Sequence, residues 1–156
     1  MIRLRPAAVG DADAMAQVYA RAVRGLGARD YAPEQVEAWA GQGPTGDGLR
    51  RRLADGRRCW VAVDADDQVC AFVDLEADGH IDLLYAAPEA AGTGVASRLL
   101  DELERAARQD GMRRLYVEAS EGARRVFLKR GYADLGRRDF AIAGVAIHNY
   151  AMELGL

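Results

Sequence analysis

Cysteine, histidine and long apolar runs are all scarce in this chain of 156 residues. Its two cysteines, Cys59 and Cys70, lie in adjacent predicted strands, so we interpret them as small buried side chains and favour a reduced pair over a disulfide. No apolar run approaches the length that spans a bilayer, and the N-terminus lacks the apolar segment of a signal peptide. These absences predict a cytoplasmic protein without a membrane partner.

The chain also lacks an excess of basic residues. Its formal net charge is −3, which argues against general affinity for nucleic acid. Half of the residues are hydrophobic, and the sequence shows neither repeats nor low-complexity tracts. This length and composition predict one domain, residues 1–156, that is large enough to bury a core.

The most informative segment that is present runs from residue 81 to residue 100. It reads as an apolar strand, a break at Pro88, and then a helix that Gly92 and Gly94 open. Val95 and Leu99 begin an apolar series that recurs every four residues along this helix.

A glycine-rich turn at the start of a helix leaves several backbone N–H groups without partners. Because the helix dipole adds partial positive charge there, the turn is suited to a phosphate or a pyrophosphate. An ordinary connection between a strand and a helix explains the segment equally well when it is taken alone.

The common phosphate-binding loops do not fit this segment. A Walker loop requires Lys and Ser or Thr after its last glycine, where this chain has Val95 and Ala96. A dinucleotide-binding fingerprint requires a third glycine, where this chain has Ser97.

A different pattern does match. The segment resembles the acyl-CoA-binding motif of the GNAT superfamily of N-acetyltransferases, in which a strand ending in x-x-Pro precedes Gln/Arg-x-x-Gly-x-Gly/Ala. Pro88 takes the proline position, and residues 91–96 take the loop. Ala91 replaces the usual Gln or Arg, which removes a side-chain contact but no backbone donor, so we expect weaker cofactor affinity rather than none.

The remaining elements agree with the resemblance and extend it over nearly the whole chain. The order implies the α/β fold of that superfamily, a splayed mixed sheet of about six to seven strands with helices on both faces. The expected strands are 2–5, 59–63, 69–76, 80–86, 114–118, 132–139 and 145–154. The expected helices are 11–24, 33–40, 49–53, 92–109 and 122–130, with a flexible loop at 41–48.

A second signature lies between residues 115 and 138. Ala123, Gly131 and Tyr132 match the family pattern of a helix followed by Gly-Phe/Tyr. In many members a tyrosine four residues before that glycine protonates the leaving thiolate, but here that position is Phe127, so the usual acid is absent. The combination of residues 31–35 with Ala38-Trp39 resembles a subset of uncharacterised bacterial members.

The resemblance implies acetyl-CoA as co-substrate, with its pantetheine arm against a strand edge. The N–H near Ala86 could polarise the thioester carbonyl. Arg98, Arg124 and Arg125 could meet the 3′-phosphate, or could simply form a solvated helix face. The implied cofactor-binding residues are Leu84, Tyr85 and Ala86 at the strand edge, and Gly92, Thr93, Gly94, Val95, Ala96 and Ser97 at the pyrophosphate.

Transfer to an amine requires a base, because an ammonium group has no lone pair. His80 occupies the position of a glutamate that some members use, although it could equally just begin a strand; Asp82 is the alternative and Glu118 a third candidate. The leaving thiolate also needs a proton. Tyr132 is our candidate for the acid that supplies it, but the sequence does not distinguish Tyr132 from Tyr85, Tyr116 or a bound water. No metal-ligand set is predicted.

The acceptor side is expected at Tyr31 and Trp39. Three nearby carboxylates, Asp30, Glu34 and Glu37, would suit a cationic acceptor such as a polyamine or lysine. The alternative for Trp39 is core packing under a mobile lid. His148 and Tyr150 share one side of the last strand and could also face the acceptor.

The resulting hypothesis is an acyltransferase that moves an acetyl group from acetyl-CoA to a primary amine by direct attack in a ternary complex. The alternative is an acyl-CoA-binding module without catalysis, suggested by Ala91 and Phe127 together. A structural domain is the weakest alternative, because it leaves the turn at Gly92 without a role. Family habit also makes a homodimer plausible.

Overall fold

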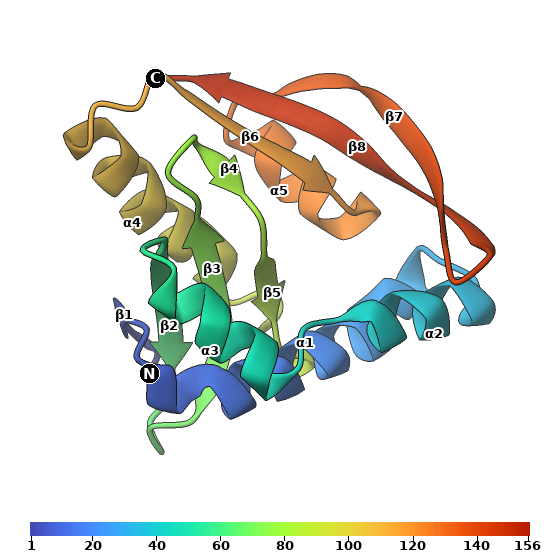
Figure 1. Cartoon of the computed structure of the whole chain (residues 1–156), viewed down its shortest axis with the longest axis horizontal. Helices are drawn as coiled ribbons and strands as arrows, with labels where there is room; N and C mark the ends of the chain where they lie inside the picture. The colour runs from blue at the N-terminus through green and yellow to red at the C-terminus, as the bar shows by residue number, and fades with distance from the viewer.

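A computed structural model describes all residues, 1–156, as two four-stranded sheets that diverge from a common side (Figure 1). The first sheet has the order β1-β2-β3-β5 and is antiparallel throughout. The second has the order β4-β6-β8-β7, with β4 parallel to β6 and the other pairs antiparallel. The strands are β1 (Arg3–Pro6), β2 (Arg58–Val63), β3 (Val69–Leu75), β4 (His80–Ile81), β5 (Leu84–Ala86), β6 (Arg114–Ala119), β7 (Ala133–Ile142) and β8 (Val145–Gly155).

The divergence begins between β4 and β5, where the sequence predicted one continuous strand over residues 80–86. That prediction is wrong, because Asp82 and Leu83 interrupt the strand and the chain changes sheets there. The Asp74 carboxylate accepts a hydrogen bond from the Leu83 N–H at 2.7 Å, and the Asp74 N–H donates to the Leu83 carbonyl at 3.1 Å. These bonds keep Leu83 on β3 while β4 leaves to pair with β6, so seven predicted strands become eight.

Helices cover both faces of the first sheet, as the sequence predicted. Strand alternation places Val61 and Val63 in one core cluster with α1 (Ala12–Leu26) and α3 (Gly46–Ala54). It places Trp60 and Ala62 in the other cluster with α4 (Val95–Gln109). Two further helices, α2 (Pro33–Gln42) and α5 (Glu121–Lys129), contact the second sheet, and single 3-10 turns occupy Val9–Asp11, Gly27–Arg29 and Pro88–Ala90.

The predicted loop at 41–48 is shorter than expected. Helix α2 continues to Gln42, and α3 begins at Gly46, so that only residues 43–45 connect them. Thr45 explains the early start, because its side-chain oxygen accepts a hydrogen bond from the Gly48 N–H at 3.1 Å and caps the helix. One arginine of α3, Arg52, lies beside the gap between the sheets.

Two other expectations concern the cysteines and the membrane. Both thiols are free, and burial raises the pKa of Cys59 to about 12 and also raises that of Cys70. None of the helices combines the length and the apolar character needed to cross a bilayer.

Candidate active site

Two adjoining cavities occupy the region where the sheets separate. The large cavity, about 670 Å³, lies between α1, the start of α4 and α5. The small cavity, about 330 Å³, lies between the α2–α3 connection, β6 and the β7–β8 hairpin. The residues that line both are Tyr31, Trp39, Leu84, Tyr85, Ser120 and Ala123.

The start of α4 forms one wall of the large cavity. Gly92 and Gly94 both have positive φ, at 76° and 82°, which turns the chain into the helix without a side chain in the way. Thr93 is an exception to the expected row of donors, because its N–H and its hydroxyl both donate to the Ala90 carbonyl. The amides that have no acceptor within the protein are those of Gly92, Gly94, Val95, Ala96 and Ser97.

The edge of β5 forms the wall that the two cavities share. Ala87 donates to a β3 carbonyl at 2.8 Å, and the Leu83 carbonyl accepts from a β3 amide at 3.1 Å. Since bonded pairs alternate along an antiparallel ladder, Tyr85 also bonds to β3, whereas the polar backbone groups of Leu84 and Ala86 point away from it. No further strand pairs with β5, so these groups face the gap.

Basic side chains at the large cavity differ from those expected. Arg98 donates to the Ile2 carbonyl and Arg124 pairs with Asp134, and neither lines the cavity. Arg125 lines it and is paired with Asp30 at 2.8 Å. Sequence reasoning missed two lining residues that form no ion pair, Arg29 and Lys129. Lys129 follows Arg125 by four residues on α5, a spacing that could have indicated it.

His80 does not line the small cavity, although its neighbours Asp82 and Glu118 do. Its Nδ1 is 2.7 Å from Glu76 Oε1, its Nε2 is 2.8 Å from Glu118 Oε1, and its ring stacks on Tyr116. The bond to Glu118, together with that to Glu76, raises the pKa of His80 to about 9. A pKa in this range favours a ring that carries both protons at neutral pH, so His80 would have to lose a proton before it could act as a base.

Replacing His80 with Asn is expected to lower stability more at pH 6 than at pH 10. The folded pKa of about 9 exceeds the ordinary histidine value of 6.5, so the stabilisation is fully present below pH 6.5 and is lost as the pH rises through 9. The difference in Tm between the two proteins, followed by circular dichroism, should shrink to near zero at pH 10. A difference that stays constant across this range would contradict a charged His80.

Glu118 projects from β6 into the wall of the small cavity. About a third of its side chain is exposed, and the hydrogen bond from His80 lowers its pKa. Asp82 also lines this cavity, but Arg57 Nη1 bonds to its carboxylate at 3.0 Å and Arg52 Nε lies at 3.6 Å. Glu118 is therefore a cavity carboxylate with no arginine bound to it.

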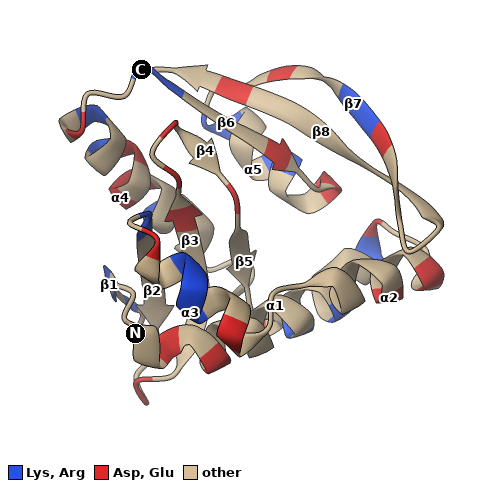
Figure 2. Ribbon diagram, in the orientation of Figure 1, with Lys and Arg blue, Asp and Glu red and all other residues tan.

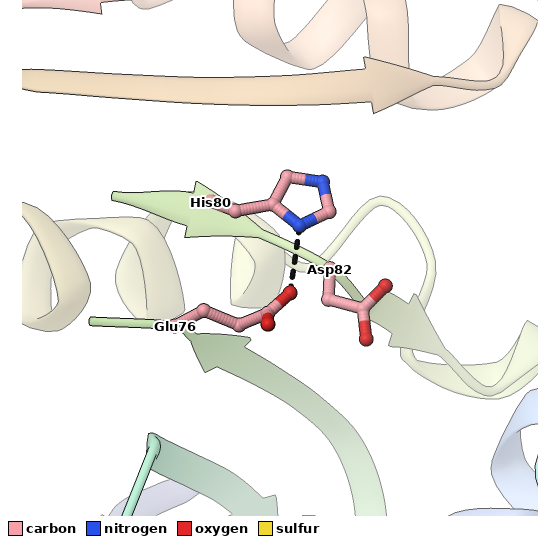
Figure 3. A group of neighbouring side chains, drawn as sticks. All are labelled: Glu76, His80 and Asp82. Carbon is pink, nitrogen blue, oxygen red and sulfur yellow. Dashed lines mark hydrogen bonds and ion pairs between the residues drawn. The ribbon is translucent and has the colours of Figure 1, made fainter. Parts of the chain in front are cut away.

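The cluster of Glu76, His80 and Asp82 brings three potential metal ligands within 4.8 Å of one another (Figure 3). Its chemistry does not suit a cation. The guanidinium of Arg57 already bonds to Asp82 and lies 3.8 Å from Glu76, and a protonated His80 has no lone pair to offer. Arg57 also bonds to buried Asp74, whose pKa burial raises to about 6.

The tyrosines considered as acids are placed less favourably than expected. Tyr132 is 3% exposed, packs against Phe127 at 4.8 Å between ring centroids, and lines neither cavity. Burial raises its pKa, and its hydroxyl has no hydrogen-bond partner. Tyr116 donates to Asp78 and also lies outside both cavities. Tyr85 lines both cavities, but partial burial raises its pKa.

Tyr31 and Trp39 stand together where the two cavities meet. Their rings form an edge-on pair with centroids 5.4 Å apart. The Tyr31 hydroxyl donates to the His148 carbonyl at 3.0 Å and accepts from the Glu121 N–H at 3.1 Å. His148 and Tyr150 each bond to the Glu121 carboxylate at 2.7 Å, so this network connects the segment before α2 with α5 and β8 across the site.

The carboxylates expected to attract a cationic acceptor do not line the small cavity. Asp30 faces the large cavity and is paired with Arg125, and Glu37 pairs with Arg24. Glu34 is exposed on the outside of α2. The acidic residues of this segment therefore provide no basis for a cationic acceptor.

Comparisons with known proteins agree with this arrangement. A family model described as an acetyltransferase (GNAT) domain matches residues 27–154. The chain belongs to the GNAT acetyltransferase family. It is accordingly an acetyl-CoA-dependent N-acetyltransferase, and the predicted family and fold class are confirmed.

Individual relatives of this acetyltransferase cover nearly its whole length. A crystallised GCN5-related N-acetyltransferase from Rhodopseudomonas palustris is 33% identical, with a TM-score of 0.88 over 99% of this chain and 95% of that one. The uncharacterised N-acetyltransferase YafP of Escherichia coli is 28% identical over 97% of this chain and 95% of its own. PaiA N-acetyltransferase from Thermoplasma acidophilum, solved with coenzyme A, shares the fold at 18% identity and a TM-score of 0.80, covering 100% and 99% of the two chains.

Proposed function

We propose that this acetyltransferase transfers an acetyl group to an amine acceptor by direct attack while both substrates are bound. The observation that carries the proposal is the common wall of the two cavities, the edge of β5. Acetyl-CoA would enter through the large cavity and the amine through the small one. When the amine and the thioester are bound on either side of the β5 edge, the amine can attack the thioester directly, so no covalent enzyme intermediate is needed.

The large cavity fits the co-substrate. Five unpaired amides at the start of α4 would bind the diphosphate, and Arg29, Arg125 and Lys129 would meet the remaining phosphate. The unpaired backbone groups of Leu84 and Ala86 would bind the pantetheine arm as an added strand. Acetyl-CoA supplies a thioester carbonyl, and the Ala86 N–H would stabilise the negative charge that develops on its oxygen.

Glu118 is the base that we propose. It lines the acceptor cavity, and it has no arginine on its carboxylate. Charged His80 holds the carboxylate in place and keeps it ionised, so His80 acts as a positioning residue. Asp82 is the second candidate, because it lines the same cavity but is paired with Arg57.

No tyrosine takes the place of the missing acid, so solvent would protonate the thiolate in our proposal. Phe127→Tyr is expected to raise kcat by about 2–10-fold, since a thiolate leaves readily and an added acid improves it only modestly. Phe127 lines the small cavity, as does Phe140, so Phe140→Tyr is a control that adds a hydroxyl elsewhere in the same space. An unchanged kcat in Phe127→Tyr would show that the step needs no added acid.

Free thiol release from acetyl-CoA in the presence of a panel of amines tests the proposed function. Amine-dependent release supports transfer. Tight binding of acetyl-CoA without release for any amine would instead indicate a non-catalytic acyl-CoA-binding module. Protection against thermal unfolding by CoA measures binding independently of turnover.

A further inference from the structure

Arg57 lies at the point where the two sheets part, and it is surrounded by carboxylates. Figure 2 shows acidic positions on β3, in the turn before β4, and between β4 and β5. Arg57 Nη1 donates to Asp74 at 2.9 Å and to Asp82 at 3.0 Å. Its Nη2 donates to Asp55 at 2.8 Å and lies 3.8 Å from Glu76. One guanidinium therefore joins β3, the break after β4 and the end of α3.

The chain on the two sides of this break is held to different sheets. On one side, β4 pairs with β6 of the second sheet. On the other side, the N–H and the carboxylate of Asp74 bond to the backbone of Leu83, which keeps that residue on the first sheet. Asp82 lies between these attachments and belongs to neither sheet. Its side chain is held by the same nitrogen of Arg57 that holds Asp74.

The carboxylates of Asp74 and Asp82 depend on Arg57 to lie close together. Asp74 is buried, and both burial and the charge of Asp82 raise its pKa, whereas the bond from Arg57 lowers it. Loss of Arg57 would leave a buried charge without its partner, which is strongly unfavourable. Two carboxylates that share one site repel each other unless one takes up a proton. The break would then move away from β3, together with Leu83.

We propose that Arg57 is a positioning residue for the co-substrate, because it fixes the strand break that leaves the edge of β5 free for the pantetheine arm. This inference rests on the proposed function, which assigns the arm to the backbone of Leu84 and Ala86. Leu83 directly precedes these residues, so a shift of Leu83 would displace the groups that bind the arm. Arg57 lines neither cavity, so it would touch no substrate and acts through the backbone.

The effect of Arg57 should be confined to one end of CoA. The amides that we assign to the diphosphate lie at the start of α4, on the wall of the large cavity. The four carboxylates around Arg57 lie on other elements, and none of them lines that cavity. A change at Arg57 should therefore weaken binding of the arm and leave binding of the nucleotide unchanged.

The test measures the binding of CoA and of 3′-phospho-ADP, which is CoA without its pantetheine arm, to Arg57→Met. We expect the Kd for CoA by isothermal titration to rise about 10-fold or more, the scale of one lost hydrogen bond to the arm. The inhibition constant of 3′-phospho-ADP, measured by competition with CoA, should stay within about two-fold of wild type, because its site is remote from the change. Arg57→Lys makes the same comparison in a variant that keeps the positive charge. It should raise the Kd for CoA by a smaller factor, since an ammonium group lacks the planar fork that joins several carboxylates.

Arg58→Met is the matched control. Arg58 is the next residue, is exposed, and pairs with Asp110 at 2.9 Å, away from the break. It should keep both wild-type affinities. The double variant Arg57→Met/Asp82→Asn removes one of the two facing carboxylates. It should therefore bring the Kd for CoA back to within about three-fold of wild type, which a variant with general damage to the fold would not do.

Three results would contradict these expectations. If the Kd for CoA in Arg57→Met and Arg57→Lys stays within about three-fold of wild type, the inference about Arg57 is wrong and the proposed function stands. Equal losses for CoA and 3′-phospho-ADP, or no recovery in the double variant, would also overturn it, because the defect would then not be specific to the arm. Failure of the wild-type protein to bind CoA would refute the proposed function and this inference with it.

Discussion

Gly94→Asp is expected to raise the Kd for CoA by about 100-fold or more, corresponding to about 2.8 kcal/mol. Gly94 occupies the N-cap of α4, directly before the amides that we assign to the diphosphate. An aspartate there would place its carboxylate beside those same amides, at the cost of a left-handed backbone conformation. Its carboxylate would thus compete with the diphosphate for the amides and repel it. Isothermal titration with CoA measures the loss.

The control for backbone strain lies at the other end of the same helix. Gly111 follows α4 with φ at 78°, close to the 82° of Gly94, and a side chain at either position meets nothing within 4 Å. Gly111→Asp therefore imposes a similar conformational cost and adds the same charge far from the proposed diphosphate site. It should retain wild-type affinity for CoA. Affinity in Gly94→Asp within about three-fold of wild type would refute the assignment of the loop.

The loop could be predicted from the sequence because its geometry is local. Two glycines at positive φ and an apolar repeat every four residues specify the turn and the helix within one continuous segment. The break after β4 could not be predicted in the same way. It depends on the side chain of Asp74 reaching the backbone of Leu83, which the apolar pattern of residues 80–86 does not reveal.

The surroundings of His80 show the same limit. Glu76 is four residues earlier, across a tight turn, and its proximity could be inferred from the hairpin. Glu118 is 38 residues away and approaches only because β4 pairs with β6. This second carboxylate, together with the first, raises the pKa of His80 to about 9, and the distance of Glu118 along the chain hides that shift from the sequence.

Arg52 illustrates a site residue that carries no signal in the sequence. It is the third of three consecutive arginines on a short helix, a pattern that usually describes a solvated face. Its place in the small cavity follows from how α3 packs on α1, which is a contact between segments distant in the sequence. Tyr132 is the opposite case. It matches the family pattern and was a candidate acid, but its side chain is buried in the core.

Glu118→Gln is expected to lower kcat/KM for the acceptor by about 100-fold at pH 7, the lower end of the range for general bases, with the Kd for CoA unchanged. The glutamine keeps the size and a hydrogen-bonding oxygen but accepts no proton. The defect should shrink as the pH approaches the pKa of the acceptor amine, because an amine that is already neutral needs no base. This pH profile separates a base from a residue that only shapes the cavity.

Glu76→Gln is the matched control for that prediction. Glu76 is the other carboxylate on the His80 ring and lines neither cavity, so its replacement perturbs the same imidazole without touching the acceptor space. It should keep kcat/KM within about three-fold of wild type, because the bond between His80 and Glu118 remains. Asp82→Asn discriminates between the two candidate bases, because a larger loss of kcat/KM there than in Glu118→Gln would identify Asp82 as the base. Equal losses of kcat/KM in Glu118→Gln and Glu76→Gln would instead show that both carboxylates act only by supporting the structure around His80.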